Sequence, residues 1–443
     1  MEMSYYWHLV EPHLTITPTS KKGAGNSKLW LLDWPRTVQK TRMQGKKNIP
    51  SGVASDKNVD TIPLNREKKH TPDYILLGIV AILTIIGWIA ISSTTSVNET
   101  TRPISTHGIK HGFMLGVGFL CLFILQGLDY RRLAKISPLM IGLGLALLSL
   151  LFIPSLGQEV NGARSWLKLP GLPSTQPSEL VKLLVIIYMS AWLAAKGKQL
   201  GSITSGILPF MLISGSSVGL ILLQPDIGTA FVLALIIGCM FFIAPTTKII
   251  HIAVMVLLAA AAAFLLIISA PYRWERILAF IAADSDPEGF GYQAIQLANA
   301  FGSGGLMGQG LGLSRQKFFY LPAAKTDGIM AVIGEETGFI GSLVVIILLT
   351  LLLWRCWLLM RNASDMFGSL LATGVAAWIA FQSGLNISGA TNLLPLTGVP
   401  LPLISYGGSA LISLLAAVGI LLSVSRYTVD FNSIDERQIK ITK

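Results

Sequence analysis

The chain has 443 residues, of which 52% are hydrophobic and 13% are charged, and its mean hydropathy is +0.62. Ordinary soluble domains carry about 25% charged residues, so this composition excludes a soluble globular protein and predicts one that crosses a membrane. The net charge of +11 does not indicate nucleic-acid binding, because about a third of the Lys and Arg residues lie in positions 1–72. A basic tail beside a membrane domain is usually a topology signal or a contact for anionic lipids.

The two ends of the chain differ from its middle. Residues 1–72 are polar and basic, which predicts a disordered tail. Residues 427–443 form a second, short polar tail. Between them, 73–426 is predicted to be one membrane domain.

Ten apolar segments of that domain are long enough to cross a bilayer, which takes about 20 residues, and apolar runs of this length span lipid as helices. With soft edges they are 73–95, 107–126, 136–153, 178–195, 203–223, 227–244, 248–270, 328–353, 366–388 and 407–424. We therefore predict an all-α polytopic membrane protein.

The loops predict how this domain is oriented. Ten spans place both termini on one side of the membrane. The loops after spans two, four, six and eight read DYRRLAK, KGKQ, TTK and RCWLLMR. Short basic loops face the cytoplasm, so both termini are expected there, and a large extracytoplasmic loop is expected between spans seven and eight.

Polar residues gather toward the outer side of the predicted bundle, where they are candidates for function. The loop NGARSWLKLPGLPSTQPSELVKL holds Arg164 and Lys168, which either pack against lipid headgroups or bind an anion. Glu179 and Lys182 follow, three residues apart, and share one face of the next helix. They form either a structural ion pair or part of a cavity wall.

Two further loops carry candidates on the same side. In LLQPDIGTAF, Asp226 either caps the sixth span or serves the site. The long loop before span eight is aromatic and glycine-rich, and its cations include Arg276 and Lys325. We expect this loop to fold onto the outer face as short interfacial helices.

The stretch LPAAKTDGIMAVIGEETG brings three acids to the start of span eight. On a helix, Glu335 is rotated by about 80° from Asp327 and Glu336 by about 180°, so the three cannot share one site. Asp327 is expected to face an outer cavity. The two glutamates are expected to form hydrogen bonds between helices.

The loop before span ten, NLLPLTGVPLPLISYGGSALI, cannot be a continuous helix because it contains three prolines. Gly407 and Gly408 allow a close approach of another segment. Non-helical backbone at this depth is tolerated where protein buries it or where it lines a cavity.

Together these stretches resemble the signature sequences of the SEDS family (shape, elongation, division and sporulation). The resemblance covers about 73–426 and is closer to the division member than to the elongation member. It implies a peptidoglycan glycosyltransferase of the bacterial cytoplasmic membrane that polymerises lipid II and acts with a class B penicillin-binding protein and other division proteins.

The resemblance also implies roles for individual residues. It makes Asp327 the catalytic aspartate and places Glu179, Lys182, Asp226 and Arg164 at the outer site. Ser405, in LPLISYGGS, is a further candidate for substrate binding. The chain departs from the usual LPEAHTDFIF stretch with Ala323, Lys325, Gly328 and Met330.

The implied reaction needs a base for the acceptor hydroxyl and cations for the diphosphate leaving group. Asp327 is the candidate base, and the candidate cations are Arg164, Lys168, Lys182, Arg276 and Lys325. A divalent cation, Mg²⁺ or Mn²⁺, could assist, although no ligand cluster in the sequence demands one. A lipid II flippase and a non-catalytic division scaffold remain as alternatives.

Overall fold

A computed structural model describes residues 70–95, 106–160, 162–168, 174–244, 290–318 and 320–428, with isolated positions between 250 and 281. All of them belong to one compact unit, 62–443. The expected span 248–270 and both predicted tails fall almost wholly outside the described residues.

The other nine expected spans coincide with helices. They are α3 (Tyr74–Thr95), α4 (Thr106–Gly127), α5 (Arg131–Leu150), α6 (Pro177–Lys196), α7 (Leu208–Leu222), α8 (Ile227–Ile243), α12 (Ile329–Asn362), α13 (Met366–Ala390) and α14 (Gly408–Ser425). A short π-helix, Ile203–Ile207, continues directly into α7. Among the described helices, eight segments are long and apolar enough to cross a membrane, and α8 is a shorter apolar helix. The prediction of an all-α polytopic membrane protein is confirmed.

Two outer segments have structure of their own. The loop after α5 folds as an antiparallel hairpin of β1 (Gly157–Val160) and β2 (Ala163–Leu167), which the sequence did not predict. Part of the long loop before α12 forms α11 (Phe290–Gly304), which packs on α12.

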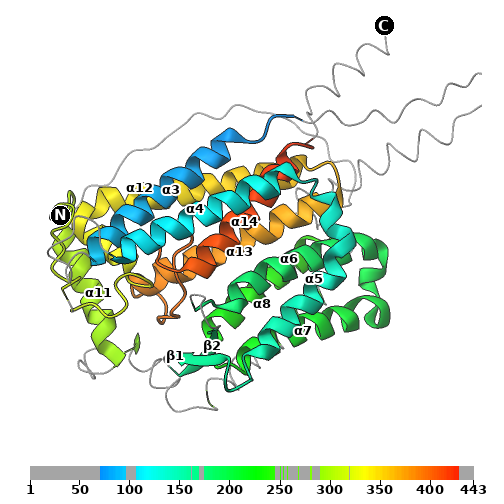
Figure 1. Cartoon of the computed structure of the whole chain (residues 1–443), viewed down its shortest axis with the longest axis horizontal. Coiled ribbons are helices and arrows are strands. Elements are labelled where there is room, and N and C mark those ends of the chain that lie inside the picture. The colour runs from blue at the N-terminus through cyan, green and yellow to red at the C-terminus, as the bar shows by residue number, and fades with distance from the viewer. Residues whose placement is uncertain are drawn as a thin grey trace, which may run out of the picture. The chain divides into compact units, whose positions relative to one another are not determined.

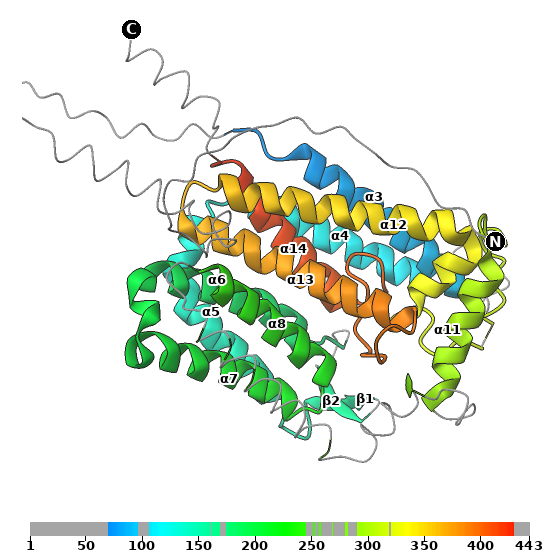
Figure 2. The same ribbon diagram turned by 180° about the vertical axis from the view of Figure 1, so that it is seen from behind.

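Helices α13 and α14 form the centre of the bundle. Figures 1 and 2 show α3, α4 and α12 on one side of them and α5, α6, α7 and α8 on the other. α13 packs against α6, α8 and α12, while α14 packs mainly against α4. Both central helices are largely buried within the protein, so the polar side chains they carry are shielded from lipid.

Helices α5 and α12 extend beyond the expected limits at the end of the bundle predicted to be cytoplasmic. The stretch RCWLLMR was predicted to be a loop, but it belongs to α12. Arg355 donates two hydrogen bonds to Asp73 Oδ2, at 2.9 and 2.6 Å, and Arg361 lies 4.8 Å from the Trp357 ring centroid. Each arginine therefore has a partner inside or beside the helix and does not end it.

α5 likewise begins at Arg131, earlier than expected, because that side chain is held by the connection between α12 and α13. Its guanidinium donates to Asp365 at 3.1 Å and to Ser364 at 2.9 Å. The phenol of Tyr130 donates to the same Asp365 carboxylate at 2.6 Å. Burial raises the pKa of Tyr130 well above its usual range, so this phenol stays protonated and remains a donor.

α12 is broken at Gly338, whose φ of 72° and ψ of −166° are not helical. An unbroken helix would bond the amides of residues 339 and 340 to the carbonyls of Glu335 and Glu336. Here those amides donate to Gly305 and Leu306, at 2.9 and 3.2 Å. The carbonyls of Glu335 and Glu336 accept from Gln309 and Gly310 at 2.9 and 3.0 Å. The loop after α11 thus replaces the bonds that the break removes.

Because of this exchange of hydrogen bonds, we expect Gly338→Ala to lower the stability of the protein strongly. A Cβ at position 338 would lie 2.4 Å from both Gly308 N and Leu306 O, and the positive φ disfavours any other residue. We expect the variant to lose at least about 2 kcal/mol of stability, from backbone strain and displacement of the loop. Gly384→Ala is the matched control, since that Cβ meets nothing within 4 Å. Thermal unfolding in detergent measures both, and equal midpoints would refute the account of the break.

Candidate functional site

The helix ends predicted to be extracytoplasmic, called the outer ends below, meet around the turn 321–328, which precedes α12. Thr326 N and Gly328 N both donate to the carbonyl of Ala323, at 3.0 and 3.2 Å, and Ala323 has a φ of 54°. The helix begins at Ile329, with Gly328 as its N-cap. Asp327 therefore lies in the turn, and the helical rotation assumed from the sequence does not set its direction.

The carboxylate of Asp327 is half-buried and accepts no hydrogen bond from any residue that the structure describes. Its neighbour across the site is Gly398, where even a methyl group would come within 3.8 Å of Asp327 Oδ2. Gly398 has a φ of 70°, a conformation that favours glycine. The carboxylate thus faces a backbone surface and keeps its acceptor sites available.

The non-helical segment 395–407 runs alongside this turn and is bonded to it. Ser405 Oγ donates to Thr326 O at 2.6 Å and accepts from Leu401 N at 2.8 Å. Tyr406 N donates to Lys325 O at 2.9 Å. Ser405, predicted as a substrate-binding residue, is buried and both its bonds are internal, so the structure places it as a link between the two segments.

Two amide side chains of α13 donate hydrogen bonds to the main chain of the 395–407 segment, and one of them also donates to the main chain of the turn. Asn386 Nδ2 donates to Asp327 O at 3.1 Å and to Val399 O at 2.9 Å. One turn earlier, Gln382 Nε2 donates to Pro400 O at 2.9 Å. The main chain of Asp327 is therefore fixed while its carboxylate is not.

Gln382 connects this support to the predicted Glu179–Lys182 pair. Lys182 Nζ lies 2.8 Å from Glu179 Oε1 and donates to Gln382 Oε1 at 2.8 Å. It also lies 4.8 Å from the Trp378 ring centroid. Lys182 is completely buried, so of the two readings the structure favours an internal ion pair over a cavity wall. Glu179 Oε2, also buried, has no hydrogen-bond partner in the described structure.

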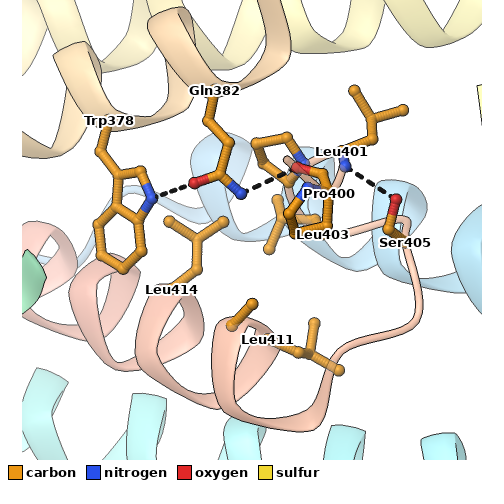
Figure 3. A pocket seen from close by; sticks show the side chains of 10 residues that line it. Trp378, Gln382, Pro400, Leu401, Leu403, Ser405, Leu411 and Leu414 are labelled. Atoms are coloured by element: carbon orange, nitrogen blue, oxygen red, sulfur yellow. Dashed lines mark hydrogen bonds between the residues drawn. The ribbon is translucent and has the colours of Figure 1, made fainter. Parts of the chain in front are cut away.

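Figure 3 shows a small cavity beside these residues. Trp378 Nε1 donates to Gln382 Oε1 at 2.6 Å on one side of it, and Ser405 bonds to Leu401 on the other. Leu411 and Leu414 of α14 complete the wall. The cavity is lined by residues of the 395–407 segment, α13 and α14.

Asp226 lies at the start of α8, and the predicted cap is confirmed. It caps the helix by accepting from Thr229 N at 3.1 Å, and its other oxygen accepts from Gln176 Nε2 at 3.0 Å. Two residues on, Gly228 packs on the 395–407 segment, since a Cβ there would lie 2.5 Å from Thr397 O. Asp226 is therefore next to the segment that faces Asp327.

Lys325 supplies the cation nearest to Asp327 in sequence. Its Nζ lies 3.3 Å from His107 Nε2 and 5.4 Å from the ring centroid of Tyr406. An ammonium group has only donors, so the imidazole nitrogen accepts. Burial raises the pKa of Tyr406, so the phenol that the Lys325 ammonium approaches is neutral.

Glu335 and Glu336 are buried and hold the loop that follows α11. Glu335 accepts from Ser314 Oγ, from Arg315 N at 2.9 Å and from Gln316 N at 3.3 Å. Glu336 accepts from Ser93 of α3 at 2.6 Å and pairs with Lys317 at 2.9 Å. The expected bond between helices exists for Glu336, whereas Glu335 bonds to a loop.

The remaining predicted residues belong to other segments or lie outside the described residues. Arg164 is on β2 and Lys168 follows it, and neither has an ion pair with a described residue. Gly408 approaches Met114, which a Cβ would meet at 3.2 Å, whereas a Cβ at Gly407 would make only ordinary contact. Arg276 lies outside the described residues. Within the described part of the chain, no three His, Cys, Asp or Glu side chains form a metal-binding group.

The sequence analysis did not single out Trp378, Gln382 and Asn386. The signal was present, because these residues recur every four positions in an otherwise apolar span and so occupy one helical face. Charged residues are the stronger signal in an apolar span, and neutral amides are easily overlooked beside them.

We predict that Asn386→Ala lowers turnover roughly 10- to 100-fold, because small displacements of catalytic groups have effects of this size. The change removes both bonds that fix the main chain at Asp327 and Val399. The apparent KM for substrate should change little. Ser388→Ala, on the same helix, is the control. Steady-state kinetics of both variants test this. Unchanged turnover in Asn386→Ala would show that Asn386 does not position Asp327.

The geometry defines a class of protein: a polytopic membrane protein with an available carboxylate and, two residues before it, a lysine, in a turn that precedes one of its helices. A family model for FtsW, RodA and SpoVE, described as cell cycle proteins, matches residues 73–430. The chain belongs to this family and is a multi-pass membrane protein of a bacterial cell.

Individual relatives agree with this assignment. Stage V sporulation protein E of Bacillus subtilis is 39% identical over 363 residues, covering 82% of this chain and 99% of the relative. The probable peptidoglycan glycosyltransferase FtsW of Trichlorobacter lovleyi is 38% identical over 355 residues, covering 80% of this chain and 93% of the relative.

Solved structures are similar as well. A chain in a structure on the coordination of polymerization and crosslinking by a peptidoglycan synthase complex gives a TM-score of 0.66 at 30% identity, covering 80% of this chain and 98% of that one. The rod shape determining protein RodA of Thermus thermophilus gives 0.60 at 28% identity, covering 81% and 98%.

Proposed function

We propose that this chain is a peptidoglycan glycosyltransferase that polymerises lipid II at the outer face of the cytoplasmic membrane, in septal wall synthesis. The relatives named FtsW and the peptidoglycan synthase complex support the activity and the division role. Within the molecule, the proposal rests on the carboxylate of Asp327. It lies at the outer helix ends, is fixed through its main chain, and has no hydrogen-bond partner among the described residues.

In the proposed reaction, Asp327 accepts the proton from the 4-hydroxyl of the acceptor's N-acetylglucosamine. The resulting oxygen nucleophile attacks the anomeric carbon of the donor's N-acetylmuramic acid with inversion. The bond from that carbon to the diphosphate breaks, and undecaprenyl diphosphate leaves with the electron pair. Lys325 is the cation best placed to stabilise the leaving diphosphate, as a point charge. Asp226, beside the same segment, is proposed to orient the sugar hydroxyls.

We further propose a class B penicillin-binding protein and other division proteins as partners. The similarity to a chain of a peptidoglycan synthase complex supports this.

The flippase and scaffold alternatives make different predictions. A transporter typically binds its substrate near the bilayer midplane, whereas Asp327, Lys325 and Asp226 lie where helices begin, outside the helix interiors. Measuring glycan formation and transfer between leaflets in proteoliposomes that contain labelled lipid II distinguishes the three functions. We expect glycan to form from lipid II in the outer leaflet without transfer between leaflets. Transfer without glycan would indicate a flippase. Neither product, with binding to a penicillin-binding protein retained, would indicate a scaffold.

A further inference from the structure

A row of large apolar side chains lies exposed on the loop between α11 and the turn at Asp327. We call Leu306, Met307, Leu311 and Leu313 the 306–313 ridge. Their exposed fractions are 70%, 78%, 68% and 64%. Such exposure of four neighbouring apolar residues is unfavourable in water and marks a surface that meets another apolar phase.

The ridge is rigidly attached and its backbone is largely paired. Gln309 N and Gly310 N donate to the carbonyls left free by the break in α12, and Gly308 N donates to Gly304 O at 2.8 Å. Gly305 O and Leu306 O accept from the far side of the break, and Leu313 N donates to Gly310 O at 3.1 Å. Non-helical backbone can lie in a membrane only where such groups are satisfied.

Two polar contacts between the α3 and α12 segments indicate how deep the ridge lies relative to the membrane. At one end Asp73 pairs with Arg355, and at the other Ser93 donates to Glu336. The contacts are separated by about 20 residues on α3 and about 19 on α12, or roughly 30 Å at 1.5 Å per residue. This separation equals the thickness of the hydrocarbon core. The ridge is bonded to Glu335 and Glu336, so it lies at the outer boundary of that core.

We propose that the 306–313 ridge inserts into the outer leaflet at the boundary between headgroups and acyl chains. The partner is the lipid surface itself. Because the same loop is held by Glu335 and Glu336 of α12, this contact fixes the height of the turn at Asp327 above the bilayer. The proposal does not depend on the reaction assigned to that turn.

Spin labels test the proposal in the full chain, reconstituted in liposomes of phosphatidylglycerol and phosphatidylethanolamine. Met307→Cys and Leu311→Cys are labelled in a background where Cys121 and Cys239 are replaced by Ala; Cys356, which is fully buried, stays. Power saturation then compares accessibility to oxygen, which concentrates in lipid, with accessibility to a water-soluble nickel chelate. Glu159→Cys on the exposed β1 strand is the aqueous control, and Leu343→Cys on α12 is the lipid control.

We expect oxygen accessibility to exceed nickel accessibility several-fold at both ridge positions, as at Leu343, with the reverse at Glu159. A ridge that behaves like Glu159 lies in water, and this result would overturn the proposal. Low accessibility to both reagents would mean that protein covers the ridge and would overturn it equally. Because both replaced side chains are exposed, labelling is not expected to prevent folding. Quenching of a fluorophore at the same cysteines by brominated lipids gives an independent measure of depth.

Discussion

Asp327→Asn is expected to lower the turnover of lipid II polymerisation by about 10²- to 10⁴-fold, the range typical for loss of a general base. The substitution keeps the size of the side chain and the main-chain carbonyl that accepts from Asn386. The apparent KM and the thermal stability should therefore stay close to those of the wild type. Single-turnover kinetics and thermal unfolding, measured on the same preparation, check the two halves of this prediction.

The control for Asp327→Asn is Glu159→Gln, which neutralises an exposed acid on the β-hairpin. It should retain full turnover. If Asp327→Asn also retained near-wild-type turnover, another group would be the base. If it unfolded instead, its carboxylate would have a structural partner that the described residues do not reveal.

Lys182→Met is expected to destabilise the protein by about 3–5 kcal/mol, the usual cost of leaving one member of a buried ion pair without the other. Glu179 is 2% exposed and loses its charged partner, while Gln382 loses a donor to its carbonyl. The 395–407 segment, held through Gln382, should loosen. Thermal unfolding of the purified variant measures the loss.

The double variant Glu179→Gln/Lys182→Met distinguishes this explanation from a simple packing defect. It removes both charges, and an apolar or neutral replacement of a whole buried pair is often nearly neutral. We expect it to regain most of the stability lost in Lys182→Met. A double variant as unstable as the single one would show that lost packing, and not the unpaired carboxylate of Glu179, sets the cost.

The helices were largely predictable because long apolar runs leave few alternatives in lipid. The observed α3 and α4 agree closely with the expected spans. The errors occur where tertiary contacts override local sequence. Arg355 seemed to end a span, but Asp73, directly before α3, pairs with it and α12 continues. The β1–β2 strands are too short to show a clear alternating pattern in sequence.

The sequence predicted which residues belong to the candidate site better than it predicted how they are arranged in space. The structure brings Asp327, Lys325 and Ser405 together through bonds between two loops, as their shared place at the outer end suggested. Sequence alone did not show that Lys182 is fully enclosed, nor that Glu335 is occupied by loop donors. Those features depend on side chains from distant segments, and no local pattern encodes their positions.

Whether Asp327 is the base of a lipid II polymerase can be read from the reaction product. Wild-type protein and Asp327→Asn, each with a class B penicillin-binding protein whose transpeptidase is blocked, receive labelled lipid II, and the products are separated by size. We expect a ladder of glycan strands with the wild type and none with Asp327→Asn. Ladders of equal intensity from both proteins, or none from the wild type, would contradict it.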